Sequence, residues 1–243
     1  MTPAFDDVAD IDRLLTTSKS VRRRLDLKRP VPRDVVLECI EIACYAPNAS
    51  NAQEWRWVVV DDPQLRDEVG KQYRAITEPP VSEMLSTKAR LGDQSGAAIS
   101  RSILYLAERM SDVPCIVIPC YDVDAAGARY RALMPASAAD REVQTDAPMS
   151  AAMYASIYPA VWNFQLALHS RGLGSVLTTA HQADQAAMAS ILRIPSSWEQ
   201  TCLIPVAYTT GPPFTRSPRR PVEDVVIWNR ECNDRREGEE LGL

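Results

Sequence analysis

The sequence predicts a single α+β domain, and three observations lead to that prediction. The chain has 243 residues, enough for one large hydrophobic core. Apolar residues make up 46% and charged residues 24%, both close to the average of globular domains. The candidate strands are few and separated by helical segments, with no internal repeat or clear domain boundary. We therefore expect one domain over residues 1–243, with a core over about 10–228 and a C-terminal arm over about 211–243.

The first half of the chain predicts three helices and one strand. The helices are expected over residues 6–15, from Pro32 to about 46, and from 62 to about 76, and the strand over 55–60. Pro32 and Pro63 suit a first helical turn, where the missing N–H costs nothing. Asp62 is expected to be the N-cap of the third helix, as is Asp184 for the helix over 184–192 in the second half. Pro47 ends the second helix, because the residue before a proline avoids the α region. Residues 78–100 have weak periodicity and are interpreted as a mobile excursion with some helix.

The second half predicts three strands around two helices. The strands are expected over residues 113–121, 175–179 and 202–208, and the helices over 150–171 and 184–192. The first of these helices has a continuous apolar face and ends at Gly172, a natural C-cap. Pro159 inside it implies a kink or a late start. Residues 127–148 are expected to form a loop with a short helix, and residues 211–221 an extended tail rich in proline and arginine.

The composition disfavours several classes of protein. The formal net charge of −5 argues against a general nucleic-acid binder. Only two histidines are present, and none of the six cysteines forms a CxxC pair, so a metal site is not expected. With nine glycines the chain carries no dinucleotide fingerprint, P-loop or nucleophile elbow. No secretory signal or membrane-spanning run is evident, so we expect a cytoplasmic protein without a membrane partner.

Three polar segments are candidates for a binding site. The first is a basic run with interleaved hydroxyls, which suits a phosphate or another anion and otherwise is a solvated turn. The second is an amide-rich loop that could contact the edge of a heteroaromatic ring and otherwise is an ordinary connection. The third is a stiff segment with two guanidinium groups, which otherwise is a solvated tail. In order, they span residues 18–24, 46–55 and 217–221.

Taken in order, these segments resemble the FMN-dependent nitroreductase family. The resemblance is carried by KSVRRRL, APNASNAQEW, YPAVWNFQLALHSRGLGSVLTT, IPVAYTTG and RRP, and it covers about residues 19–228. It implies a nitroreductase-like α+β sandwich with a central, mainly antiparallel sheet flanked by helices. It also implies a homodimer with FMN at the subunit interface and a domain-swapped C-terminal arm that wraps the partner.

The resemblance also implies a set of cofactor-binding residues. Lys19, Ser20 and Arg22 match the block that holds the FMN phosphate and the N1–O2 edge of the ring, and Arg24 adds to it. Pro47, Asn48 and Asn51 match the loop that reaches the isoalloxazine from the other subunit. Thr178 and Thr179 match a strand end near the ring, and Arg219 matches a late phosphate-binding arginine. No catalytic side chain is expected, because the chemistry takes place on FMN.

The activity implied is that of an FMN-dependent NAD(P)H oxidoreductase. We expect ping-pong turnover, in which NAD(P)H reduces FMN and a nitroaromatic, a quinone or a similar small electrophile then takes the electrons. Residues 78–100 and 127–148 would set the choice of acceptor. Two alternatives remain at this stage. One is a flavin-binding storage or sensing protein without efficient turnover, and the other is a flavin-fragmenting enzyme of the same superfamily.

Overall fold

The computed structural model describes residues 8–133 and 146–229, and a five-stranded sheet forms its centre. The strand order is β1-β2-β5-β3, and β4 pairs with β2 beside β5. Every pairing between these strands is antiparallel. The strands are β1 (Trp55–Val60), β2 (Cys115–Asp122), β3 (Leu173–Ser175), β4 (Trp198–Gln200) and β5 (Ile204–Tyr208). The predicted α+β class with a mainly antiparallel sheet is confirmed.

Strand β2 is buried on both faces. Its apolar run CIVIPCY alternates between two separate cores, as the two-residue period of a strand requires. Cys115, Val117 and Tyr121 belong to one core cluster. Ile116, Ile118 and Cys120 belong to the other. Helices must therefore cover both faces of the sheet.

One face is covered by α2 (Arg33–Ala43) and α7 (Asp146–Ser170). The predicted apolar face of α7 is confirmed, because Ile157, Val161, Phe164 and Leu168 are all at most 1% exposed. The helix begins before Ser150, so Pro159 does not delay its start. The N–H of Gly172, which has a φ of +75°, donates to the carbonyl of His169, as expected of a residue that ends a helix.

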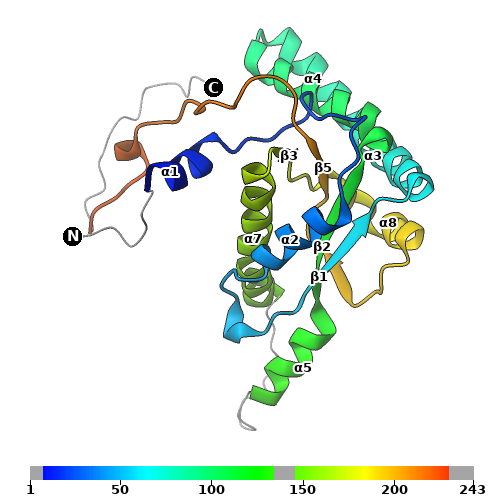
Figure 1. The fold of residues 1–243 in the computed structure, drawn as a ribbon, viewed down its shortest axis with the longest axis vertical. Helices are drawn as coiled ribbons and strands as arrows, with labels where there is room; N and C mark the ends of the chain where they lie inside the picture. Colours follow the sequence, from blue (N-terminus) through cyan, green and yellow to red (C-terminus); the bar gives the residue numbers. More distant parts are fainter. Residues whose placement is uncertain (1–7, 134–145, 230–243) are drawn as a thin grey trace.

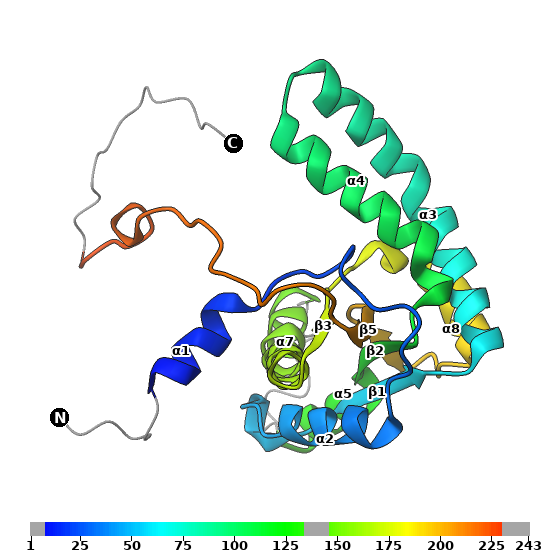
Figure 2. The same ribbon diagram turned by 45° about the horizontal axis from the view of Figure 1, so that its top comes forward.

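The other face is covered by α3 (Pro63–Arg90), α4 (Gln94–Arg109) and α8 (Gln185–Leu192), and Figure 2 shows the two helical layers on either side of the strands. Asp62 and Asp184 are N-caps as predicted, and their carboxylates accept from the N–H groups of Leu65 and Ala187 at 3.0 Å.

The remaining described helices are α1 (Val8–Thr17), α5 (Val123–Leu133) and the short turns η1 (Ala49–Asn51), η2 (Met110–Asp112), η3 (Ala180–Asp184) and η4 (Val222–Asp224).

Residues 78–100, interpreted from the sequence as a mobile excursion with some helix, are helical except at 91–93. They form the outer part of a helical hairpin made by α3 and α4 (Figure 2). Pro79 and Pro80 lie inside α3, where packing keeps the chain helical because the neighbouring Thr77 and Val81 are buried. The reversal uses Gly92 at a φ of +73°, and Asp93 then caps α4.

Two other segments differ most from the sequence prediction, while the remaining predicted boundaries shift by only a few residues. The strand expected over 175–179 is β3 over Leu173–Ser175, and pairing resumes only as an isolated bridge between Thr178 and Leu203. The expected loop over 127–148 begins inside α5 and ends inside α7, and residues 134–145 lie outside the described part of the chain. Strand β4 was not predicted.

Helix α1 and the tail over residues 211–229 both extend away from the sheet on the same side of the molecule, and they diverge from each other in Figure 2 (Figures 1 and 2). A hydrogen bond of 3.2 Å from Arg216 to the Thr16 hydroxyl joins them. No residue of α1 is buried, although its apolar and polar side chains are on separate faces. Val222, Val225, Ile227 and Trp228 in the tail are 61–74% exposed. The described residues of this chain leave both segments largely uncovered.

No helix in the described part of the chain is both long enough and apolar enough to cross a membrane.

Candidate functional site

A cavity of about 570 Å³ brings the basic run and the tail together. Three predicted site residues line it: Lys19, Ser20 and Arg219. The sequence separates Arg219 from the other two by almost the whole length of the chain. Two cations and a hydroxyl around one cavity form a donor set that suits a phosphate group.

The basic run reaches this cavity because it pairs with the edge of the sheet. Ser20 forms a parallel bridge with Ser175 at the end of β3, and the Val21 N–H donates to the Ser175 carbonyl at 2.9 Å. Val21 and Leu25 are each 5% exposed and belong to the core on the α3 side. These buried residues fix the segment, so Lys19 and Ser20 are held at the cavity.

Arg22 is half-buried and lies beside the helical hairpin. Its one hydrogen bond in the described structure is long, 3.5 Å from a guanidinium nitrogen to the Ser102 hydroxyl of α4. No carboxylate among the described residues forms an ion pair with it. Burial lowers the pKa of Arg22. A desolvated cation without a counter-ion is a favourable partner for an anionic ligand.

Arg24 is engaged elsewhere. Its Nε donates to the Thr210 carbonyl at 2.6 Å, and a second nitrogen of the guanidinium donates to the Pro212 carbonyl. The guanidinium also lies over the Phe214 ring, 4.1 Å from its centre. Arg24 therefore fixes the direction in which the tail leaves the sheet, and it does not line the cavity.

Thr178 and Thr179 directly follow Leu177 in the sequence, and Leu177 lines the cavity. The Thr178 hydroxyl is hydrogen-bonded to the buried Tyr73 hydroxyl at 2.9 Å. Thr179 is exposed and precedes η3. Neither threonine is among the lining residues.

The amide loop lies against the N-terminal half of α7, away from the lining residues. Its Ala49 N–H donates to the Ser156 hydroxyl, and the Asn48 side chain accepts from the Gln53 N–H at 3.0 Å. Ser50, Asn51 and Gln53 have φ values of 53°, 49° and 60°, a conformation that non-glycine residues adopt at a cost. Pro47 and Asn51 are exposed. The chain does not bring Pro47, Asn48 and Asn51 to its own cavity.

The other lining residues were not among the predicted cofactor-binding residues. Ser18 and Ser217 lie within the candidate segments 18–24 and 217–221, whereas Trp162, Gln165 and Leu177 lie outside the three candidate segments. Trp162 and Gln165 are on the side of α7 away from its buried apolar face, and Trp162 is 45% exposed. In the sequence, Trp162 falls outside the helical spacing of the buried apolar face, and a tryptophan at such a position is a signal that could have identified it.

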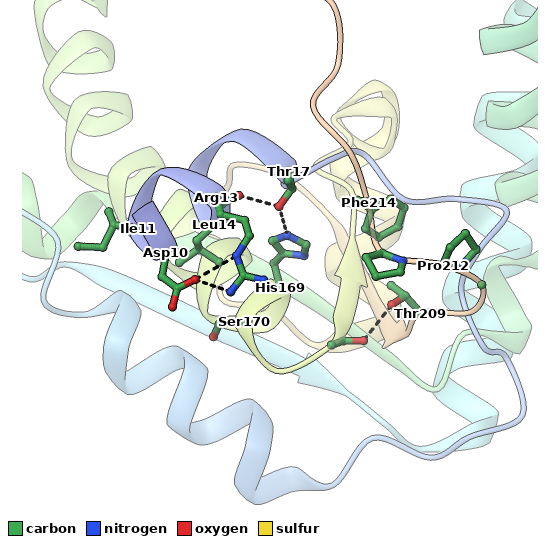
Figure 3. Close-up of a pocket in the computed structure, with 13 residues that line it drawn as sticks. Asp10, Ile11, Arg13, Leu14, Thr17, His169, Ser170, Thr209, Pro212 and Phe214 are labelled. Atoms are coloured by element: carbon green, nitrogen blue, oxygen red, sulfur yellow. Dashed lines mark hydrogen bonds and ion pairs between the residues drawn. The ribbon is translucent and has the colours of Figure 1, made fainter. Parts of the chain in front are cut away.

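A second cavity, of about 660 Å³, lies between α1, the end of α7 and the root of the tail (Figure 3). His169 accepts from or donates to the Thr17 hydroxyl at 3.0 Å, and its ring lies near Phe214. The cavity contains none of the predicted site residues, and its Arg13 is paired with Asp10. It is lined mostly by apolar groups, so a phosphate suits it less than the cavity at Lys19.

The two histidines do not form a reactive centre. His181 is fully buried, and neither of its ring nitrogens has a hydrogen-bond partner among the residues that the structure describes. Within the described ranges, no group of three or more His, Cys, Asp and Glu side chains is placed to hold a metal ion.

The part of the chain that supplies most of the residues lining this cavity matches a known protein family. A sequence model described as the Nitroreductase family matches residues 16–208, which include most of the cavity. An NADH dehydrogenase of Thermus thermophilus is 28% identical over 210 residues, covering 86% of this chain and 91% of its own length.

Solved structures share the fold. Oxidised iodotyrosine deiodinase bound to FMN and 3-iodo-L-tyrosine has a TM-score of 0.62 at 21% identity, covering 91% of this chain and 99% of its own. A Nitroreductase Family Protein from Streptococcus pneumoniae TIGR4 has a TM-score of 0.61 at 20% identity, covering 90% and 100%. At these identities the likeness concerns the arrangement of the chain.

Burial of His181 predicts a specific loss of stability in acid. Burial lowers the pKa of His181 from 6.5 to about 4. The unfolded chain takes up this proton near pH 6.5 and the folded protein near pH 4. The contribution of the neutral, buried His181 to the free energy of unfolding is therefore complete above pH 6.5 and is lost as the pH falls toward 4. Replacing His181 by Leu should flatten the urea-unfolding profile over this range by up to about 1.4 kcal/mol per pH unit. His169→Gln is the control and should retain the slope due to His181. A His181→Leu profile parallel to that of the wild type would contradict the prediction.

Proposed function

Since the chain belongs to the Nitroreductase family, we propose that it is an FMN-dependent NAD(P)H oxidoreductase. It passes a hydride from the nicotinamide to FMN, and then reduces a nitroaromatic, a quinone or a similar small electrophile in a ping-pong cycle. The observation that carries the proposal is the cavity at which Lys19, Ser20 and Arg219 meet.

These three residues would hold the FMN phosphate. Lys19 and Arg219 supply charge-assisted hydrogen bonds, and Ser20 supplies a hydroxyl donor. The position of Ser20 is fixed through its bridge to Ser175, whose hydroxyl also accepts from the Gln165 side chain at 3.1 Å. The phosphate site is therefore built on the edge of the sheet and on α7, both rigid elements of the fold.

Arg22 would face the N1–O2 edge of the ring. FMN supplies the hydride-transfer chemistry when bound. The Arg22 cation has no carboxylate partner in the described structure that would neutralise it. Arg22 would therefore favour a negatively charged, reduced ring over the oxidised ring and would raise the reduction potential.

The proposal includes a homodimer. The amide loop with Pro47, Asn48 and Asn51 is remote from the cavity of its own chain, which is consistent with a contribution to the second copy's site. The exposed apolar residues of α1 and the tail support the same assembly, because a large uncovered apolar surface marks an interface. Domain exchange of the tail between two copies would cover these residues.

The remaining parts of the proposal concern partners and compartment. The partners are NAD(P)H and a small-molecule electron acceptor, without a nucleic acid or a membrane. A cytoplasmic location is supported by the cysteines, because all five in the described ranges are free thiols.

The direct test is an absorbance spectrum of the purified protein, followed by anaerobic titration. A yellow protein is expected, whose flavin absorbance is bleached by NADH or NADPH and recovers when menadione or a nitroarene is added. A protein that stays colourless when FMN is supplied would refute the proposal. A yellow protein that neither nucleotide reduces would instead support the storage or sensing function, and loss of the flavin during oxygen turnover would support the flavin-fragmenting one.

Replacing Arg22 by Ala should weaken FMN binding by removing a charge-assisted contact. The expected loss is on the order of 1.5–3 kcal/mol, measured by fluorescence titration of the apoprotein. Arg23→Ala is a matched control, because Arg23 is adjacent in sequence but lies over the Tyr105 ring of α4. Unchanged affinity in Arg22→Ala would mean that the basic run is only a solvated turn.

Truncation after Pro213 should reduce both dimer content and flavin content. It removes Arg219 from the cavity and the exposed apolar residues of the tail from the interface. Light scattering and the ratio of flavin to protein absorbance measure the two effects. The full-length Arg219→Ala variant separates them, since it should lose flavin and remain a dimer. A stable, yellow truncated dimer would be the opposite of the expected result.

A further inference from the structure

The segment that carries Arg219 to the cavity has no backbone framework of its own. From residue 211 to residue 220, no backbone N–H donates to a backbone carbonyl within the described structure. Three of these ten residues are prolines, which have no N–H to donate. The Arg219 side chain itself donates only to the carbonyl of its neighbour Pro218 in the described part of the chain. The position of Arg219 at the cavity must therefore depend on side chains that hold the tail.

Arg24 holds the root of the tail from the basic run. Its Nε donates to the Thr210 carbonyl at 2.6 Å, and another nitrogen of the guanidinium donates to the Pro212 carbonyl. The guanidinium also lies 4.1 Å from the centre of the Phe214 ring. In Figure 3, Thr209, Pro212 and Phe214 lie together at this root. One side chain thus contacts three residues of the tail root.

Gly211 shows how closely the chain passes this guanidinium. It has a φ of +82°, a conformation that glycine adopts without the cost that other residues incur. A Cβ at this position would lie 3.3 to 3.5 Å from three atoms of the Arg24 guanidinium. The backbone therefore turns directly against Arg24, and even a methyl group would press on the contact.

A second contact fixes the tail a few residues further on. Nε of Arg216 donates to the Thr16 hydroxyl of α1 at 3.2 Å. Ser217 and Arg219 follow directly, and both line the cavity. Because the tail is held first by Arg24 and then by Thr16, the path of the chain brings Arg219 to the side of the cavity opposite in sequence to the basic run.

We propose that Arg24 is a positioning residue of the phosphate site, which fixes the tail so that Arg219 faces the phosphate of the flavin. The inference rests on the proposed function, since it requires that FMN binds in this cavity. It goes beyond that function because Arg24 does not line the cavity and acts through Arg219. The basic run then supplies two direct ligands, Lys19 and Ser20, and also positions the third.

The first test is the affinity of the apoprotein for FMN, measured by fluorescence titration. Arg24→Ala should bind FMN about tenfold more weakly, the fold-change that corresponds to one charge-assisted hydrogen bond. Arg24→Lys should lose nearly as much, because a single ammonium keeps the charge but cannot serve both carbonyl groups and the ring. Wild-type affinity in Arg24→Lys would mean that Arg24 acts through its charge alone, and it would overturn the inference.

The control is Arg29→Ala. Arg29 also lies over an aromatic ring, 3.3 Å from the centre of Tyr208, but this ring belongs to β5 and not to the tail. The variant should bind FMN as the wild type does. An equal loss of affinity in Arg29→Ala and Arg24→Ala would show that any disturbance of this edge of the sheet weakens the site, and the inference would fail.

A double variant separates positioning from general support of the fold. If Arg24 acts through Arg219, then Arg24→Ala combined with Arg219→Ala should bind FMN no more weakly than Arg219→Ala alone. A merely structural role would weaken binding again in the Arg219→Ala background. Losses that multiply in the double variant would therefore overturn the inference.

A second pair of variants covers the case in which Arg24→Ala does not fold. Gly211→Ala disturbs the same contact from the side of the tail, at an exposed position. Gly92→Ala is its matched control, because Gly92 has a similar φ of +73° and nothing within 4 Å of an added Cβ. FMN affinity should fall in Gly211→Ala and stay at the wild-type value in Gly92→Ala. Equal affinities in the two variants would contradict the inference.

Limited trypsin digestion without FMN tests the hold on the tail separately. Trypsin should cut after Arg216 and Arg219 faster in Arg24→Ala than in the wild type, and an unchanged rate rejects the inference. If the wild type binds FMN and is reduced by NAD(P)H while Arg24→Ala binds FMN equally well, the proposed function stands and the role of Arg24 is rejected. If the wild type binds no FMN, both proposals are rejected.

Discussion

The burial of β2 on both faces is the constraint on which the rest of the fold depends. A strand whose alternate side chains are all apolar cannot leave either face to water, so helices are needed on each side. The helices α2 and α7 cover one face, and α3, α4 and α8 cover the other. The order of the strands then leaves β3 at an edge of the sheet. An edge strand has unpaired backbone groups, and the basic run satisfies some of them through the bridge between Ser20 and Ser175. The position of the candidate site is thus a consequence of how the sheet ends.

Local patterns in the sequence predicted the structure correctly where a single residue or a short segment determines it. The strand Trp55–Val60, the caps at Asp62 and Asp184 and the buried face of α7 are of this kind. The helical hairpin was not predictable in this way, because Pro79 and Pro80 argue against a helix and only the packing of α3 on α4 overrides them. Strand β4 has three residues and exists only through its pairing with β2, so no local pattern could reveal it.

The candidate site was predictable in residue type but not in orientation. Lys19, Ser20 and Arg219 were identified through the family resemblance, and the fold brings them to one cavity. Arg24 is chemically equivalent to its neighbours, yet it binds the carbonyl groups of Thr210 and Pro212. That difference depends on the path of the tail, which lies almost two hundred residues further along the chain. Single-sequence reasoning cannot tell which of several adjacent arginines faces a ligand and which is used for structure.

The uncovered apolar residues of α1 and the tail also affect how cofactor loading depends on the amount of protein. If a second copy covers them and each site needs both copies, association and FMN binding are linked equilibria, and each strengthens the other by the same factor. Dilution would then release the cofactor even at a constant FMN concentration, and an excess of FMN would hold the two copies together. The cellular level of the protein would thereby set the fraction that is active, without any separate regulatory site.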